Sequence, residues 1–235
     1  NTQEVASTSE SVGKTFESGR EDGRFMETAG FYHAYLKNLR PRLEFDPEMT
    51  AEDMDGWRVR LREKLRELLC FPEVDSVPEP KRLWEKPREG YRLEKWEAYP
   101  EPYSVVPFYI LVPDGVSADS PAPTVMCFSG SSASKENLAG ELAEGVTTMP
   151  SERKWLDNRM AYHYARNGFI AVALDSPGTH ETASPLCSRN AFSFNATWMG
   201  RPYESVSVFQ KAHILHWLAG QAQVDANRIA VSGHS

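Results

Sequence analysis

The residues best suited to chemistry stand at the end of the chain, where a short apolar run leads into Gly233-His234-Ser235. The spacing Gly-x-Ser is the first part of a nucleophile elbow, a sharp turn that exposes a serine hydroxyl at the carboxyl end of a sheet. A serine held in this way attacks an acyl carbon once a base takes its proton. We therefore predict Ser235 as the nucleophile. His234 is directed away from the neighbouring hydroxyl in such a turn, so we place it at the border of the pocket.

A loop of small residues, Ser129 to Ser134, follows the apolar run 124–128 and can supply a second part of such a site. Small side chains leave backbone N–H groups uncovered, and acyl transfer needs these donors where the carbonyl oxygen becomes negative. In this layout one donor comes from a loop after an earlier strand. We predict the amide of Ser131 as that oxyanion-hole donor. An ordinary Gly/Ser turn is the alternative interpretation.

A third candidate, Asp175, follows the apolar run 169–174 and precedes Pro177 and Gly178. Proline and glycine enforce a turn directly after a buried strand, which places the carboxylate at the rim of the sheet. Short acidic side chains in loops commonly accept hydrogen bonds from backbone amides. We therefore predict that Asp175 supports the pocket or its loops, and we favour this role over a direct catalytic one.

A different arrangement would make the chain self-sufficient, with Ser132 as nucleophile, Asp175 as acid and His180 as base. A triad requires direct contact between base and nucleophile. Asp175 and His180 lie in one loop, and no second elbow glycine follows Ser132. This alternative also leaves the elbow at Gly233 unexplained, so we favour Ser235.

The other histidines and the cysteines do not form a metal-binding pattern. His213 and His216 lie on one predicted helix, but no third ligand accompanies them at a suitable spacing. Cys70, Cys127 and Cys187 are too scattered for a disulfide framework or a C-x-x-C site. The sequence therefore predicts no metal.

The composition is that of a globular protein with a sizeable core. Of the 235 residues 40% are hydrophobic, and 33 acidic against 26 basic residues give a formal net charge of −7. This balance disfavours nucleic acid and anionic membranes as partners and favours a small or neutral molecule. No apolar run approaches the roughly 20 residues of a membrane-spanning helix. The first residue, Asn1, suits an exported protein after processing or a trimmed polypeptide, which slightly favours a periplasmic or secreted location.

Residues before 88 predict an N-terminal extension. Residues 1–24 are polar, so we expect a flexible arm. Residues 25–87 are expected to form a helical extension, with helices over 31–39 and 50–70, followed by a proline-rich linker from Phe71 to Pro87. Thr50 with Asp53 three residues later predicts a capping box at the start of the second helix.

From residue 88 the sequence predicts strands that alternate with helices. The expected strands are a hairpin and three buried strands: 91–99, 105–112, 124–128, 169–174 and 229–231. The expected helices lie near Leu138, over 155–167 with Gly168 as a left-handed cap, and over 201–221. This order predicts an α/β fold of three layers, in which a mostly parallel sheet is covered by helices on both faces. Ligands of such sheets bind beyond the carboxyl ends of the strands, where the candidate residues fall.

With these residues the chain resembles the α/β-hydrolase superfamily, and within it bacterial acetyl-xylan-esterase-like serine hydrolases. The similarity covers about Thr50 to Ser235 and is carried by four motifs: Gly130-x-x-x-x-Lys135-Glu136, Asp175-x-Pro177-Gly178, Met199-Gly200-Arg201 and Asp225-x-x-Arg228-Ile229-x-x-x-Gly233-x-Ser235. The resemblance implies a serine ester hydrolase in which Ser235 attacks an acyl carbonyl, a histidine serves as base and then acid, and an Asp or Glu orients the histidine. It implies no metal and no organic cofactor.

The chain departs from that family by ending at the predicted nucleophile. In the family fold later strands carry the acid and the histidine, and a cut at Ser235 leaves a long strand edge unpaired. We therefore expect residues 88–235 to be the N-terminal part of a hydrolase domain, inactive alone, with the C-terminal remainder of the same fold as its partner. The implied substrate is a small ester or an acylated saccharide. A serine peptidase of the prolyl-oligopeptidase type and a non-catalytic binding protein with this fold are the alternatives.

Overall fold

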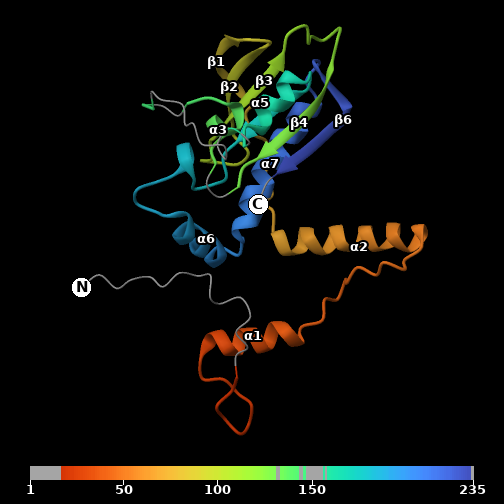
Figure 1. The fold of residues 1–235 in the computed structure, drawn as a ribbon, viewed down its shortest axis with the longest axis vertical. Helices are drawn as coiled ribbons and strands as arrows, with labels where there is room; N and C mark the ends of the chain where they lie inside the picture. The colour runs from red at the N-terminus through yellow and green to blue at the C-terminus, as the bar shows by residue number, and fades with distance from the viewer. Residues whose placement is uncertain (1–16, 131–132, 143–144, 147–155, 157, 234–235) are drawn as a thin grey trace. The chain divides into compact units, whose positions relative to one another are not determined.

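The computed structural model describes residues 17–130, 133–142, 145–146, 156 and 158–233. The chain divides into two compact units, Asn1–Lys64 and Leu65–Ser235. The second unit contains a six-stranded sheet with its helices (Figure 1). No helix in the described ranges is both long and apolar enough to cross a lipid bilayer.

The structure confirms the two helices predicted over 31–39 and 50–70. Helix α1 spans Thr28–Asn38 and α2 spans Ala51–Leu69. Thr50 Oγ1 accepts a hydrogen bond from the Asp53 amide at 3.2 Å, and Asp53 Oδ2 accepts one from the Thr50 amide at 3.3 Å. This reciprocal pair is a capping box, which satisfies two amides that a helix start leaves without partners.

The six strands form one sheet in the order β1-β2-β3-β5-β4-β6. Their bounds are Lys81–Arg88, Tyr91–Ala98, Val106–Pro113, Ala122–Phe128, Ile170–Leu174 and Val224–Gly233 for β1 to β6. β1, β2 and β3 form an antiparallel meander, and β3 pairs antiparallel with β5. β4 pairs parallel with both β5 and β6. The α/β class and the hairpin are confirmed, but the described sheet is mixed rather than mostly parallel.

Strand β1 lies almost entirely in the segment predicted as a proline-rich linker, Phe71 to Pro87, so that prediction is wrong for residues 81–87. β1 is an edge strand and most of its residues are exposed. An edge strand needs no apolar alternation, and it tolerates a proline such as Pro87 because one side of its backbone forms no ladder bonds. The usual strand signals are therefore missing from this sequence.

Helices cover both faces of the sheet, as expected for three layers. Helices α3 (Lys135–Ala139) and α5 (Met160–Arg166) pack on one face, and α7 (Tyr203–Ala219) packs on the other. Gly168 ends the α5 region with φ of +85°, in the predicted left-handed conformation. Helix α6 (Arg189–Trp198) occupies a segment that was expected to be a loop. Only Ala196 of α6 is buried, so no apolar stripe marks this helix in the sequence.

Candidate active site

The three strand ends that carry the candidate residues lie level at one edge of the sheet. Phe128, the last residue of β4, pairs with Leu174 at the end of β5 and with Gly233 at the end of β6. The segments that follow β4 and β5 therefore leave the sheet side by side. This is the place where α/β proteins bind their ligands.

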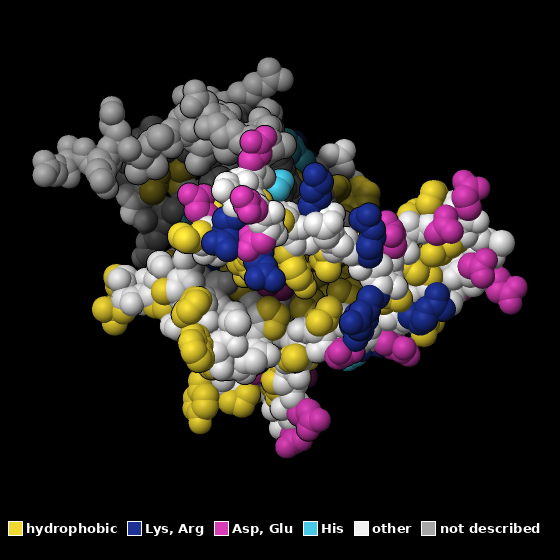
Figure 2. All heavy atoms as spheres, turned by 90° about the horizontal axis from the view of Figure 1, so that it is seen from below, with side chains coloured by type: hydrophobic (Ala, Val, Ile, Leu, Met, Phe, Trp, Pro, Cys, Tyr) yellow, Lys and Arg dark blue, Asp and Glu magenta, His cyan; other side chains and the backbone are white. Residues whose placement is uncertain are grey.

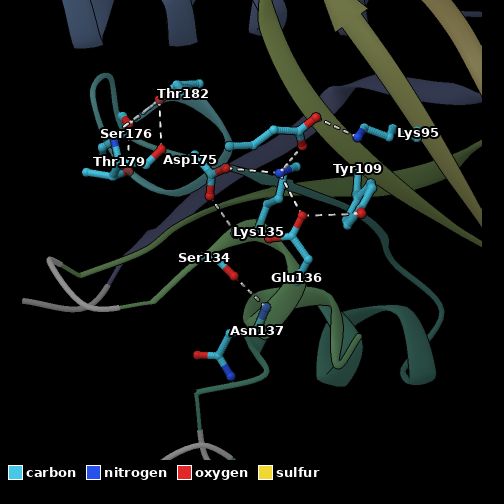
Figure 3. Close-up of polar contacts among 11 residues, drawn as sticks. Lys95, Tyr109, Ser134, Lys135, Glu136, Asn137, Asp175, Ser176, Thr179 and Thr182 are labelled. Carbon is cyan, nitrogen blue, oxygen red and sulfur yellow. Dashed lines mark hydrogen bonds and ion pairs between the residues drawn. The ribbon is translucent and has the colours of Figure 1, made fainter. Parts of the chain in front are cut away.

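Asp175, directly after β5, is almost fully buried, with 2% of its surface exposed. Its Oδ1 accepts a hydrogen bond from the backbone amide of Lys135 at 2.8 Å. Its Oδ2 lies 3.0 Å from Nζ of the same lysine (Figure 3). One carboxylate thus holds both the backbone and the side chain of the first residue of α3.

Lys135 is the centre of a larger charged cluster. Its Nζ lies 2.7 Å from Oε1 of Glu136 and also forms an ion pair with Glu181. Glu181 accepts a second bond, from Nζ of Lys95 on β2, at 2.7 Å. The hydroxyl of Tyr109 on β3 donates to Glu136 at 3.3 Å (Figure 3). The cluster therefore joins the loops after β4 and β5 to the meander.

The charges in this cluster stabilise one another. Burial lowers the pKa of Lys135, but Asp175, Glu136 and Glu181 outweigh this effect and raise it above the ordinary value of lysine. Burial likewise opposes ionisation of Glu136 and Glu181, yet their bonds to lysine hold the pKa of each below its ordinary value. These pKa directions keep Lys135, Glu136 and Glu181 ionised at neutral pH. Burial also raises the pKa of Tyr109, which keeps its hydroxyl protonated as a donor.

The described residues on either side of residues 131–132 are held in place. Phe128, before them, pairs in the sheet, and Lys135, after them, is held through its backbone amide by Asp175. Ser134 caps α3, because its Oγ accepts a bond from the Asn137 amide at 3.2 Å (Figure 3). An oxyanion hole requires backbone donors in a fixed position, and the residues that border the predicted donor have such fixed partners.

The loop after β5 is stabilised by side-chain hydrogen bonds within it and by one from α7. The Oγ1 atom of Thr179 donates to the Ser176 carbonyl at 2.7 Å, and that of Thr182 donates to the Thr179 carbonyl at 2.8 Å. From α7, the hydroxyl of Tyr203 donates to the carbonyl of Pro177 at 2.9 Å. These bonds fix the turn that Pro177 and Gly178 begin.

Two further motif residues have structural partners. Arg201, just before α7, donates from Nη1 to Glu101 at 2.7 Å and so ties the start of this helix to the turn between β2 and β3. Arg228 donates from Nε to Asp225 Oδ2 at 2.6 Å, where the register of β6 against β4 shifts. Both pairs hold elements that lead to the strand ends.

Of the candidate residues, the structure describes Asp175, whereas Ser131, His234 and Ser235 lie outside the described residues. Ser132 of the alternative triad also lies outside them. His180 is exposed, and both carboxylate oxygens of Asp175 bond to Lys135. In the described part of the chain, Asp175 therefore serves the lysine and not the histidine that this alternative needs.

The sequence analysis missed the roles of Lys135, Glu136 and Glu181. Lys135 and Glu136 belong to a motif that was noted, but charged residues at the start of a helix normally lie in solvent. Nothing in the local sequence shows that Lys135 is buried or that Glu181 reaches it from another loop. The signal that could have identified them is the position of all three directly after the two parallel strands.

Charges elsewhere on the surface are mixed. On the face drawn in Figure 2, Lys and Arg side chains lie among Asp and Glu side chains and do not gather into a broad patch of one sign. Among the described residues, no group of three or more His, Cys, Asp and Glu side chains is placed to hold a metal ion.

A mixed sheet with helices on both faces, and with polar segments after the level ends of its parallel strands, fits an α/β-hydrolase fold. A model of the Abhydrolase family matches residues 9–235. The chain belongs to this family. No curated protein matches it.

Two solved structures resemble the chain. The crystal structure of a "putative acetyl xylan esterase" from Bacteroides fragilis NCTC 9343 is 33% identical, with a TM-score of 0.80 over 93% of this chain. The chain spans 57% of the length of that protein. A methylesterase is 17% identical with a TM-score of 0.54, and the match covers 86% of this chain and 39% of the methylesterase. At that identity the second likeness shows the fold alone.

Proposed function

We propose that the protein is a serine ester hydrolase that acts on an acetylated saccharide or a similar small ester. The observation that carries this proposal is the level arrangement of three strand ends, with the loop after β4 held at both ends by the sheet and by Asp175. The 33% identity to a protein described as an acetyl xylan esterase supports the class of substrate.

In the proposed mechanism, Oγ of Ser235 attacks the carbonyl carbon of the ester while a histidine base takes its proton. The carbonyl oxygen becomes negative and accepts hydrogen bonds, one of them from the amide of Ser131. The histidine then protonates the leaving alcohol, and an acyl-enzyme remains. Water activated by the same histidine attacks the acyl carbon, and Ser235 regains its proton as the acid is released. His234 borders the pocket.

The buried charges have a positioning role in this mechanism. We infer that Asp175 and Lys135 act by holding the start of α3, which follows the predicted donor Ser131, and not as catalytic groups. A misplaced oxyanion donor costs roughly 3 to 4 kcal/mol of barrier.

The test of the nucleophile is Ser235→Ala in the complete protein. Acetate release from acetylated xylo-oligosaccharides and hydrolysis of p-nitrophenyl acetate should fall by at least ~10⁴-fold, because the attacking atom is absent. Ser232→Ala is the matched control, since Ser232 is half-buried on β6 and bonds to Tyr164. It should keep most of the activity.

Undiminished hydrolysis by Ser235→Ala would remove Ser235 from the mechanism. Cleavage of peptide amides but not of esters would favour the peptidase alternative. Binding of a saccharide with no turnover of any ester or amide would favour a non-catalytic protein.

A further inference from the structure

A groove of about 620 Å³ lies beside the charged cluster, on the face of the sheet that α3 and α5 cover. We call it the β1 groove. Its walls come from β1, β2 and β3 and from the loops that follow β4, α3 and β5. Trp84, Lys95 and Tyr109 form the sheet side, and Glu136, Glu141 and Glu181 form the opposite side.

The charges that line the groove are balanced, and most of them are paired. Arg88 holds Glu141 through two bonds of 2.7 Å, from Nε and Nη2. Lys95 holds Glu181 at 2.7 Å, and Glu136 is held by the buried Lys135. Neither an anion nor a cation gains a net attraction from such a lining. Paired groups nevertheless keep free lone pairs and N–H donors, and a hydroxyl group can both donate to the former and accept from the latter.

The groove also has an aromatic wall. The rings of Trp84 and Tyr109 lie with their centroids 5.6 Å apart at 50°. Trp84 is half-buried, and Nζ of Lys86 lies 4.5 Å from the centre of its ring. Aromatic side chains with a polar edge suit ligands that have one apolar and one polar side. A sugar ring is such a ligand, with C–H bonds on its faces and hydroxyls around its rim.

We propose that the β1 groove is a saccharide-binding subsite, which holds a sugar unit of the substrate away from the ester that reacts. Glu181 and Glu136 form part of its wall and also bond to Lys135, which Asp175 holds at the end of β5. The groove therefore shares a rigid wall with the candidate active site. This inference rests on the proposed function for its choice of an acylated glycan as the ligand.

The test compares a glycan ester with an ester that has no sugar. In Trp84→Ala, KM for acetylated xylo-oligosaccharides should rise roughly tenfold, since an aromatic anchor of a binding site is removed. The kcat for that substrate, and kcat/KM for p-nitrophenyl acetate, should stay within about twofold of the unaltered protein, because the reacting groups are untouched. Trp198→Ala is the control, since Trp198 is 79% exposed on α6 and does not line the groove.

Direct titration separates this inference from the proposed function. Calorimetry of Ser235→Ala with acetylated xylo-oligosaccharides should show binding that Trp84→Ala weakens roughly tenfold and Trp198→Ala leaves unchanged. Glycan binding that is equal in the Trp84 and Trp198 variants would overturn the subsite, even if ester hydrolysis is found. Glycan binding that depends on Trp84, together with no ester hydrolysis by the protein that retains Ser235, would support the subsite and contradict the proposed enzyme.

Discussion

Lys135 carries its charge at a position that water does not reach. Its side chain is 0% exposed, and so is that of its partner Asp175. An ion loses much of its hydration energy on burial, and for Lys135 this loss is offset by three carboxylates. For Asp175 it is offset by the lysine and by the hydrogen bond that the backbone amide of Lys135 donates. The stability of the folded protein therefore depends on Lys135 keeping these carboxylate partners.

Removal of the charge should therefore be costly. We expect Lys135→Met to lower the free energy of unfolding by about 3 to 5 kcal/mol, because it leaves buried carboxylates without their cation. Urea denaturation at neutral pH measures this change. Asp175→Asn keeps an acceptor for the Lys135 amide and should cost less.

Asp175→Asn also tests whether the charged cluster positions the loop after β4. If the cluster sets the loop after β4, kcat for p-nitrophenyl acetate should fall in Asp175→Asn, with a smaller change in KM. Folded Asp175→Asn protein with an unaltered kcat would contradict that role. A Lys135→Met protein as stable as the original would show that the cluster does not need its central charge.

At the scale of elements, the strands with strong period-2 or wholly apolar sequences could be predicted, and those without could not. The hairpin of β2 and β3 and the buried strands β4 and β5 have core residues on both faces. β1 lacks this pattern because it is an edge, and α6 lacks it because it buries little. The strand ends were predicted from the turn residues that follow them. The cluster around Lys135 was not, because long-range pairing of charges leaves no periodic trace.

Gly168 shows how a single residue ends an element. Its φ is +85°, and an added Cβ would meet no atom within 4 Å. Any cost of substitution is therefore backbone strain alone. We expect Gly168→Ala to lower the free energy of unfolding by about 1 to 2 kcal/mol, as measured by thermal or urea denaturation.

Gly168→Asn is the matched variant, because asparagine tolerates the left-handed region better than alanine. It should lose less stability than Gly168→Ala. Equal losses in the two variants would show that the conformation of this turn is not what limits stability there.

For the molecule as a whole, two acids of the cluster around Lys135 make stability depend on pH. In the folded state the pKa values of Glu136 and Glu181 lie below the ordinary value of about 4.3. As the pH falls, the unfolded chain therefore takes up protons first. The stabilisation is fully present above that value and is lost as the pH falls through the folded pKa values.

Urea denaturation between pH 7 and pH 3 should show this loss. Glu136→Gln should have a lower free energy of unfolding at pH 7 than the unaltered protein. Its free energy of unfolding should also fall less when the pH is lowered. Glu89→Gln is the control, because its side chain is 93% exposed, and its profile should follow that of the unaltered protein. A parallel loss in Glu136→Gln would show that this carboxylate does not contribute to the acid dependence.

The central strand β5 gives the two faces of the sheet different tolerance to mutation. Ile170, Val172 and Leu174 belong to the core on the α7 side, and Ala171 and Ala173 to the core beside α5. Branched side chains can change rotamer when a neighbour grows or shrinks, but alanine has no rotamer to change. As related sequences evolve, a substitution on the α7 side can thus be compensated by a neighbouring side chain that changes its rotamer. On the α5 side, where the charged cluster lies, Ala171 and Ala173 cannot repack in this way, so a change there must be accommodated by their neighbours.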